Sequence, residues 1–314
     1  MSNVVSSYPG TTSRSLKARL EAGEILVLDG ANGTLMMQYG FRGECAPELW
    51  AAEHADVMAG IHAAYIAAGA DVILTNTIGG SAPKLARYGL GDETSRLNRR
   101  LAEIAVQTAG VAERPVIVLG DVGATGELMA PAGTLSEAEM IAAHTPQIEG
   151  LLEGGVAGIF VETMLDVAEA VAAIKAARRL TALPVLASLA FDPGRRGPRT
   201  LMGQTPAQAA VALLEAGALV VGANCGSLVA AQMPAIVAEM RAAGARWVAV
   251  EPNAGLPVMA DGQTVFPQSP EEMAASVPAI LEAGARLIGG CCGTTPEHIR
   301  LIAQAVRRHA TGAR

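Results

Sequence analysis

Residues 282–298 read EAGARLIGGCCGTTPEH, and this stretch contains the unit from which most of the chain is built. Glu282–Arg286 has the pattern of a helix end, with Gly284 able to take the left-handed conformation that follows a last helical turn. The run LIGGCC at 287–292 predicts a short buried strand, and Pro296 is typical of the first turn of the next helix. The stretch therefore predicts a helix, a strand, a loop and a second helix in direct succession.

The same arrangement recurs along the chain. The phrases AAGAD, EGGVAG, EAGAL and AAGAR precede further apolar runs, and Pro115 and Pro184 end the helices before two others. Most of these runs are rich in β-branched residues and carry no charge inside them, which predicts strands buried on both faces. The eight expected strands are 25–29, 72–77, 116–121, 158–163, 185–191, 219–225, 247–252 and 287–292.

Helical patterns separate the expected strands, and clear examples are 55–68, 206–215 and 270–282. Strand alternating with helix predicts a parallel sheet, and eight units favour a closed (β/α)8 TIM barrel. We expect a single α/β domain over 21–310, after a disordered lead at 1–20. An open doubly wound sheet is the alternative, but DGANGT at 29–34 lacks the G-x-G-x-x-G order of its phosphate loop.

Composition excludes several classes of function. The 314 residues are 51% hydrophobic and 17% charged, with a net charge of −7 and no basic run that could bind a nucleic acid. Met1–Arg19 contains no apolar core of a secretory signal, and no stretch approaches the ~18 apolar residues of a membrane span. We therefore expect a cytoplasmic protein without a nucleic-acid or membrane partner, and the sequence leaves a homo-oligomer open.

Polar residues follow nearly every expected strand. In a barrel the functional site forms at the carboxyl ends of the strands, so these residues predict a site there. The alternative is that strand ends are polar simply because they meet solvent. The residues concerned are Asp29, Thr75–Thr77, Asp121, Glu162–Thr163, Asp192, Asn224–Cys225, Glu251–Asn253 and Cys291–Cys292.

Three of the four cysteines end strands six and eight, in GANCG and GGCCG. Neighbouring side chains in a strand point to opposite faces, so Cys291 and Cys292 can bind one ion only where the backbone bends, as the flanking glycines permit. Alternate strands share a layer of a barrel interior, so Cys225 can reach the pair. Three thiolates with an open fourth position are typical of a catalytic zinc site. Inert buried thiols, a strained disulfide and a redox pair are the alternatives.

The remaining cysteine and the histidines are not expected at the metal. Cys45 is far from the other cysteines in sequence and is interpreted as an ordinary thiol. The five histidines lie in or beside helical patterns, and His298 is expected to cap a helix start or lie on the surface.

A zinc ion with three thiolates is a weak Lewis acid for water but suits a fourth thiol, which it allows to ionise near neutral pH. The reaction that this favours is attack of a bound thiolate on an electrophilic carbon. A carboxylate such as Glu162 or Asp29 could hold an ammonium group, which would suit an amino-acid thiol.

GANCG at 222–226 and GGCCGTTPEHI at 289–299 resemble the zinc site of the homocysteine S-methyltransferase family. That family includes betaine–homocysteine methyltransferase and the homocysteine-binding module of cobalamin-dependent methionine synthase. DGANGT, LTNT, VET and PNAGLP resemble further motifs of the family in the same order, so the likeness covers roughly 24–307.

The resemblance implies zinc on Cys225, Cys291 and Cys292 and methyl transfer to L-homocysteine, giving methionine. It implies that Glu162 binds the substrate amino group, that Asp29 lies beside the substrate, and that Asn253 can occupy the fourth zinc position. Thr75, in LTNT, is included among the predicted substrate-binding residues.

The donor is predicted to be a small onium compound, betaine or a sulfonium, or a methylcorrinoid carried by another protein. The sequence lacks the aromatic pairs of animal betaine enzymes, although Tyr39, Phe41 and Trp50 could form a partial cage. Two other functions stay open. One is a catalytically incomplete homocysteine-binding module that works with a separate corrinoid protein. The other is a metal-free barrel with GGCCGTT as a phosphate loop.

Overall fold

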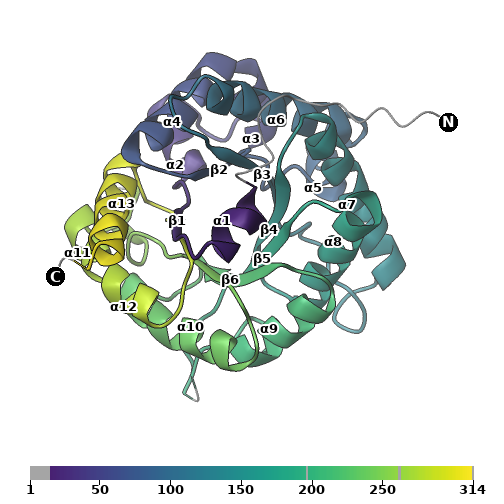
Figure 1. The fold of residues 1–314 in the computed structure, drawn as a ribbon. Helices are drawn as coiled ribbons and strands as arrows, with labels where there is room; N and C mark the ends of the chain where they lie inside the picture. Colours follow the sequence, from purple (N-terminus) through teal and green to yellow (C-terminus); the bar gives the residue numbers. More distant parts are fainter. Residues whose placement is uncertain (1–14, 196, 261–262, 313–314) are drawn as a thin grey trace.

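The computed structural model describes residues 15–195, 197–260 and 263–312. Parallel strands form an 8-stranded sheet in the order β1-β10-β7-β6-β5-β4-β3-β2, and a parallel bridge between Leu28 and Val72 joins its two edges into a barrel (Figure 1). The expected (β/α)8 barrel is confirmed, and every expected strand is present, although the first and eighth are shorter than expected and Cys291 and Cys292 lie after the end of the eighth. The strands are β1 (Leu26–Val27), β2 (Val72–Leu74), β3 (Ile117–Val122), β4 (Gly158–Met164), β5 (Val185–Leu189), β6 (Val220–Asn224), β7 (Val248–Glu251) and β10 (Leu287–Ile288).

Helices surround this barrel (Figure 1). Two of the expected helices have the predicted bounds, α4 (Ala55–Ala68) and α9 (Pro206–Glu215). The third, expected over 270–282, is wrong as a single helix, because it divides at Ser276 into α11 (Pro270–Ala275) and α12 (Val277–Glu282). Pro278 cannot donate a backbone hydrogen bond to the preceding turn, which favours a break there. The other helices are α2 (Asn32–Gln38), α3 (Pro47–Glu53), α5 (Ala82–Ala86), α6 (Thr94–Gly110), α7 (Glu137–Glu153), α8 (Val167–Leu180), α10 (Met233–Ala242) and α13 (Pro296–Ala310), with short 3-10 turns η1 (Gly91–Glu93) and η2 (Ala230–Gln232).

The barrel is filled by alternate side chains of the strands. One buried apolar cluster combines residues from all the barrel strands, among them Leu119, Phe160, Leu186 and Ala249. A second, larger cluster fills the layer between the strands and the helices. Side chains two residues apart share a face of a strand, so this inward set fixes which later residues also point into the barrel.

A helix closes the N-terminal end of the barrel, which corrects one expectation. Residues 1–14 lie outside the described residues, but Leu16–Glu21 form α1, so the prediction of disorder up to residue 20 is wrong for this part. Leu16 and Leu20 are each only 2% exposed and join the barrel's inner cluster. In Figure 1, α1 lies across the centre of the ring of strands. The helix was hard to predict because it is short and has only two large apolar side chains, Leu16 and Leu20, one turn apart.

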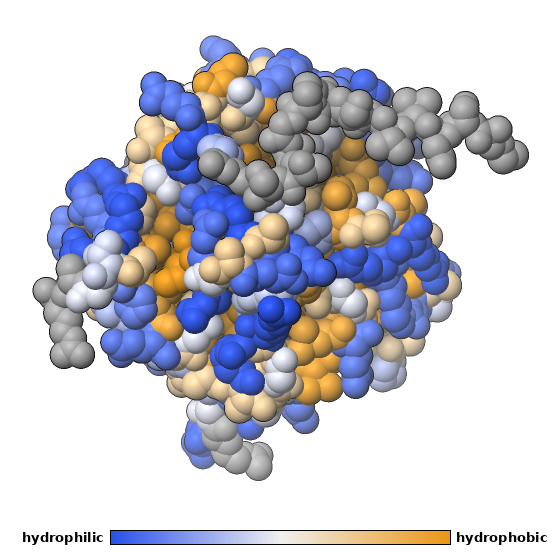
Figure 2. Space-filling model, viewed as in Figure 1, coloured by the Kyte–Doolittle hydropathy of each residue, from blue (hydrophilic) through white to orange (hydrophobic). Residues whose placement is uncertain are grey.

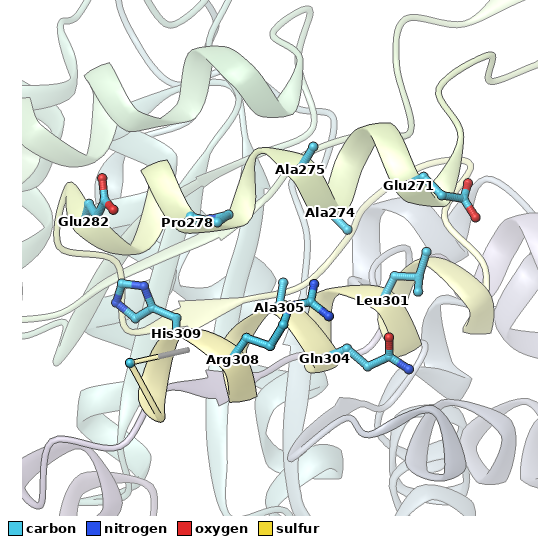
Figure 3. A pocket seen from close by; sticks show the side chains of 11 residues that line it. Glu271, Ala274, Ala275, Pro278, Glu282, Leu301, Gln304, Ala305, Arg308 and His309 are labelled. Carbon is cyan, nitrogen blue, oxygen red and sulfur yellow. The ribbon is translucent and has the colours of Figure 1, made fainter. Parts of the chain in front are cut away.

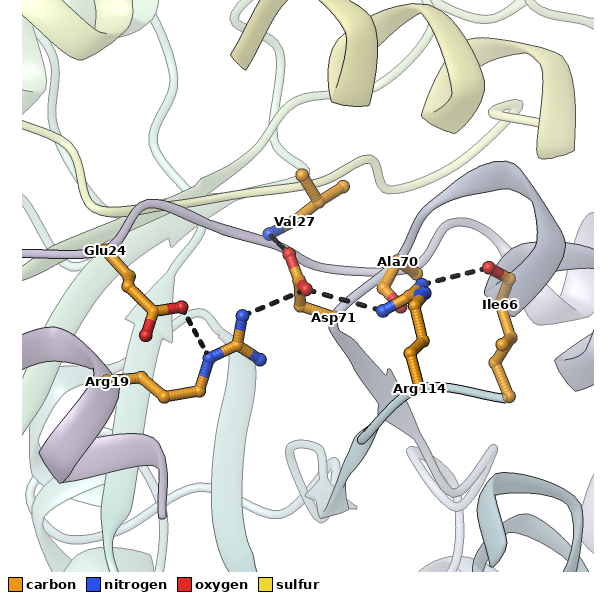
Figure 4. A network of polar contacts seen from close by, with 7 residues as sticks. All are labelled: Arg19, Glu24, Val27, Ile66, Ala70, Asp71 and Arg114. Carbon is orange, nitrogen blue, oxygen red and sulfur yellow. Dashed lines mark hydrogen bonds and ion pairs between the residues drawn. The ribbon is translucent and has the colours of Figure 1, made fainter. Parts of the chain in front are cut away.

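Ion pairs fix α1 to the barrel (Figure 4). Arg19 donates through Nε to Glu24 at 2.8 Å and through Nη2 to Asp71 at 3.1 Å. Asp71 also accepts from the Val27 amide at 3.0 Å and from Arg114 at 3.4 Å. One carboxylate therefore ties α1, β1 and the start of β2 together.

The outer surfaces carry two further features. Hydrophilic residues cover much of the face in Figure 2, with smaller hydrophobic patches between them. Among the described residues, no helix combines the length and apolar character needed to cross a membrane.

A groove of about 610 Å³ runs between α11, α12 and α13 on the outer wall, lined by residues such as Ala274, Pro278, Leu301 and Ala305 (Figure 3). None of the predicted site residues lines this groove.

Candidate metal and substrate site

Strand alternation places a polar layer inside the barrel, above the apolar one. Leu119, Phe160, Leu186 and Ala249 point inward, so the residues two positions later do too. These residues and the corresponding one of β6 are at most 7% exposed, and they are Asp121, Glu162, Ser188, Asn224 and Glu251. The carboxyl ends of β3 to β7 therefore deliver polar side chains to one buried region, as the sequence predicted for β3, β4, β6 and β7. The prediction for β5 is wrong, because the expected Asp192 is exposed and pairs with the backbone of Arg199, and the buried polar residue of β5 is Ser188.

Three strands end in a left-handed turn made by a residue other than glycine. Asn76, Thr163 and Cys225 have φ values of 56°, 54° and 53°; Asn76 and Cys225 follow β2 and β6, and Thr163 is the last residue but one of β4. This conformation is uncommon for such residues and is concentrated at functional sites. Asn224 points into the barrel, so a regular strand would turn Cys225 outward, and the left-handed turn brings its sulfur back to the mouth.

The three predicted cysteines come together. The Sγ atoms of Cys225 and Cys292 are 4.0 Å apart, those of Cys291 and Cys292 are 3.9 Å apart, and all three lie within 4.8 Å of one another. A tetrahedral zinc ion with Zn–S bonds of about 2.3 Å spaces its sulfurs by about 3.8 Å. Gly293, with φ +79°, makes the bend that allows adjacent cysteines to share this point.

The charges of the sulfurs also favour a metal. Hydrogen bonds from Cys291 and Cys292 lower the pKa of Cys225 to about 3, while the hydrogen bond to Cys225 raises the pKa of Cys291 well above its usual value. The hydrogen bond between Cys292 and Cys225 likewise raises the pKa of Cys292 to about 11. On their own the three groups thus hold one negative charge, and a divalent cation is what would allow all three to ionise.

Asn253 adds an oxygen beside the sulfurs. Its side chain is 3% exposed, hydrogen-bonds Cys225, and donates through Nδ2 to the Gly226 carbonyl at 3.0 Å. Its Oδ1 atom is buried without a hydrogen-bond partner among the described residues. A buried unpaired oxygen next to three thiols suits a metal ligand, so this part of the donor set fits the predicted ion.

Carboxyl groups form a buried cluster beside the sulfurs. Glu162 hydrogen-bonds both Asp121 and Glu251, and burial raises the pKa of Glu162 to about 7, with the nearby Cys225 as a further cause. Burial, and then the charge of Glu162, raise the pKa values of Asp121 and Glu251 well above their usual range. Neutral Asp121 and Glu251 can therefore donate to an ionised Glu162, leaving one carboxylate charge in the cluster.

Asp29 lies just after β1 and is hydrogen-bonded to β2, the strand beside which β1 closes the barrel. Its Oδ2 accepts from the Leu74 amide at 3.0 Å, and burial raises its pKa well above the usual value. The loops that follow β1 and β10 are linked by Thr294, whose hydroxyl accepts from the Ala31 amide at 3.1 Å and donates to the Cys291 carbonyl at 2.7 Å. The DGANGT and GGCCGTT motifs therefore form one wall of the site.

Thr75 has a supporting position. The Thr77 hydroxyl donates to the Asp121 carbonyl at 2.6 Å, so in the 2.6 Å contact between the two threonines the Thr75 hydroxyl is the donor. The Asp121 amide in turn donates to Thr75 Oγ1 at 3.0 Å. This closed ring uses the hydroxyl of Thr75 within the protein and fixes the backbone that carries Asp121, so any contribution of Thr75 to substrate binding runs through Asp121.

Sequence reasoning did not assign roles to Asp121, Asn224 and Glu251, although it noted all three as strand ends. Their signal was the inward register that each shares with an apolar residue two positions earlier. The expected aromatic cage is not formed by Trp50, whose ring stacks on His54 at 4.0 Å and packs against Phe41, while Tyr39 is 60% exposed.

The expected helix-capping role of His298 is confirmed. Its Nδ1 accepts from the Thr295 amide at 3.2 Å, so its Nε2 is the donor to the Gln268 carbonyl, also at 3.2 Å. Cys45 is free and packs beside the large apolar cluster, away from the three sulfurs at the barrel mouth.

A TIM barrel that gathers three thiols and a buried carboxyl cluster at its mouth defines a class of barrel protein whose thiols are arranged as the ligands of a metal ion would be. The homocysteine S-methyltransferase family model matches residues 26–306, and the chain belongs to that family of methyltransferases. The resemblance drawn from the motifs is therefore confirmed.

Named relatives agree with this assignment. The chain is 33% identical to the methionine synthase of Mycobacterium tuberculosis over 90% of its own length and 32% identical to that of Mycobacterium leprae over 91%. The matches span only 24% and 25% of those longer proteins. The metallated form of the homocysteine methyltransferase MmuM from Escherichia coli has the same fold, with a TM-score of 0.76, 25% identity, and coverage of 92% of this chain and 99% of that one.

Proposed function

We propose that this chain is a zinc-dependent S-methyltransferase that transfers a methyl group to L-homocysteine, giving methionine, with a small onium compound or a methylcorrinoid as donor. The observation that carries the proposal is the meeting of Cys225, Cys291 and Cys292 at one point, with all three sulfurs within 4.8 Å of one another. When bound, zinc would hold the acceptor thiol as a nucleophilic thiolate near neutral pH.

The chain's own residues would bind and orient the acceptor. Glu162, held in place by Asp121 and Glu251, would accept hydrogen bonds from the substrate ammonium group, and Asp29 would lie on its other side. Asn253 would fill the remaining ligand position before the thiol arrives. Holding both ends of one small molecule aligns its sulfur for displacement, which is the main contribution that a protein makes to such a reaction.

The family assignment and the relatives named for homocysteine methylation support this choice of acceptor. The donor is supported more coarsely. Trp50 is only 5% exposed, stacks on His54 and packs against Phe41, which favours a donor site elsewhere at the mouth.

The test begins with elemental analysis, which should find about one zinc per chain. The zinc-loaded protein is then incubated with homocysteine and, separately, betaine, S-methylmethionine and a methylcorrinoid, with methionine as the readout. Cys225→Ser should lose both zinc and turnover, whereas the matched control Cys45→Ser, at a thiol outside the site, should keep both. A protein without zinc, or loaded protein inactive with every donor, would contradict the proposal.

A second candidate function is a homocysteine-binding module that receives its methyl group from a separate corrinoid protein. The chain matches only about a quarter of each longer synthase. Large apolar side chains are also exposed in the segments that connect the barrel strands to the helices after them, where a protein donor would dock. Examples are Met37, Tyr39, Leu165, Leu201 and Met259. Methionine formed only when a corrinoid protein is added would select this candidate.

A further inference from the structure

Asn224 lies between the carboxyl cluster and the sulfurs. Its side chain is 1% exposed and sits one residue before Cys225, at the end of β6. Its Oδ1 accepts from the Thr163 amide at 3.0 Å and from the Ser188 hydroxyl at 2.7 Å. Two donors on one oxygen use both of its lone pairs and fix which way the amide faces.

The amide nitrogen has two hydrogens, and their partners differ. Thr163 Oγ1, at 2.6 Å, takes the first. The second faces two weaker contacts, Glu162 Oε2 at 3.5 Å and Cys291 Sγ at 3.9 Å. One hydrogen therefore stands between the carboxylate proposed to bind the substrate ammonium and a sulfur proposed to bind the metal.

The two acceptors compete for this hydrogen. An ammonium group that binds Glu162 neutralises much of the carboxylate charge, so Glu162 becomes a poorer acceptor for the Asn224 amide. The hydrogen then interacts more with Cys291. A hydrogen bond to a coordinating sulfur reduces the electron density that this sulfur gives to its metal.

We propose that Asn224 is a positioning residue that couples occupancy of the amino-group site at Glu162 to the donor strength of the Cys291 sulfur. The inference rests on the proposed function, because it assumes that an amino acid binds at Glu162 and a metal at the cysteines. It adds that binding of the amino group of the acceptor changes the metal site through a protein side chain, in addition to any effect through the acceptor itself.

Cobalt(II) provides a readout other than turnover, because its sulfur-to-cobalt charge-transfer absorption reports the donor strength of the thiolates. The probe is L-2-aminobutyrate, an amino acid that lacks a thiol and so cannot add a sulfur to the metal. In the unaltered protein we expect this probe to shift the absorption to higher energy. In Asn224→Ala we expect the shift to disappear.

Ser188→Ala is the matched control, since it removes one hydrogen bond to Asn224 but leaves the amide hydrogens in place. It should retain the shift. Asn224→Leu has a similar size and removes the donor without adding a charge beside Glu162 and Cys291, so it tests the same point if the alanine variant does not fold. Calorimetry establishes that the probe still binds each variant.

The outcomes separate two failures. If the unaltered protein binds neither cobalt nor the amino acid, the proposed function fails and this inference fails with it. If the unaltered protein binds both but shows no shift, or if Asn224→Ala binds the probe and keeps the shift, the coupling through Asn224 is wrong while the proposed function stands.

Discussion

Replacing Glu162 by glutamine tests the ammonium site with almost no change of shape. The side chain is 7% exposed and hydrogen-bonds Asp121 and Glu251, so the variant removes a charge from a region that solvent screens little. A hydrogen bond to a charged group contributes about 1.5 to 3 kcal/mol. With about 1.4 kcal/mol for each factor of ten, the Kd of homocysteine should rise about 10- to 150-fold.

The assay is calorimetry on zinc-loaded protein with two ligands of equal length. Homocysteine carries the amino group, whereas 4-mercaptobutyrate is the same thiol acid without it. Glu162→Gln should weaken the first and leave the Kd of the second unchanged within about twofold. Equal losses for both ligands would show that the variant acts on the metal centre, and no loss for homocysteine would refute the assignment of Glu162.

The pH dependence supplies a second test of the same assignment. The pKa of Glu162 is raised to about 7 by burial, so the group is increasingly neutral below that pH and attracts an ammonium group less. The affinity of the unaltered protein for homocysteine should therefore fall as pH decreases below 7. The part of this fall due to Glu162 should be absent in Glu162→Gln and for 4-mercaptobutyrate.

Three further predictions concern stability and the metal. Because the pKa of Glu162 is raised from 4.5 to about 7 on folding, its contribution to stability is present below pH 4.5 and is lost as pH rises through 7. The free energy of unfolding of metal-free Glu162→Gln, measured with denaturant, should therefore increase relative to that of the unaltered protein across this pH range. A difference between the two proteins that does not change with pH would contradict this. Leu20→Ala should reduce the free energy of unfolding by about 2 to 5 kcal/mol, against about 0.5 or less for the exposed Leu201→Ala, and equal effects would mean that α1 does not close the barrel. Gly293→Ala should weaken zinc binding in a chelator competition, because its Cβ would lie 2.2 Å from Cγ of Phe266, whereas Gly23→Ala has a similar φ, open space around it and no expected effect on zinc.

The strands and the cluster of three cysteines were predictable from the sequence because their signals are local. Each β-branched run follows a helix-ending glycine or proline, so the order of elements can be determined without knowing the contacts. Cys225, Cys291 and Cys292 end two such runs, and strand alternation in a barrel brings strands six and eight to a common layer.

What the sequence did not reveal depends on contacts between distant segments. Helix α1 is stable through Leu16 and Leu20 inside the barrel and through the Arg19–Asp71 pair, which joins residues 52 apart in sequence. The hairpin of β8 (Val258–Ala260) and β9 (Gln263–Val265) after β7 was missed for a different reason, because the Asp-Gly pair at 261–262 in the sequence is a local hairpin signal that the search for buried barrel strands passed over. The role of Asn224 required knowing its register in β6, which depends on the neighbouring strands.

The left-handed turn at Cys225 limits how the three cysteines could be designed into another barrel. A design that copied the three side chains onto evenly pleated strands would aim the first sulfur at the surrounding helices. A design must also include Gly226, where an added Cβ would lie 2.4 Å from the Phe191 carbonyl oxygen, and the backbone just after the fifth strand against which this glycine packs. The portable unit is therefore a pair of adjoining strand ends together with their turn.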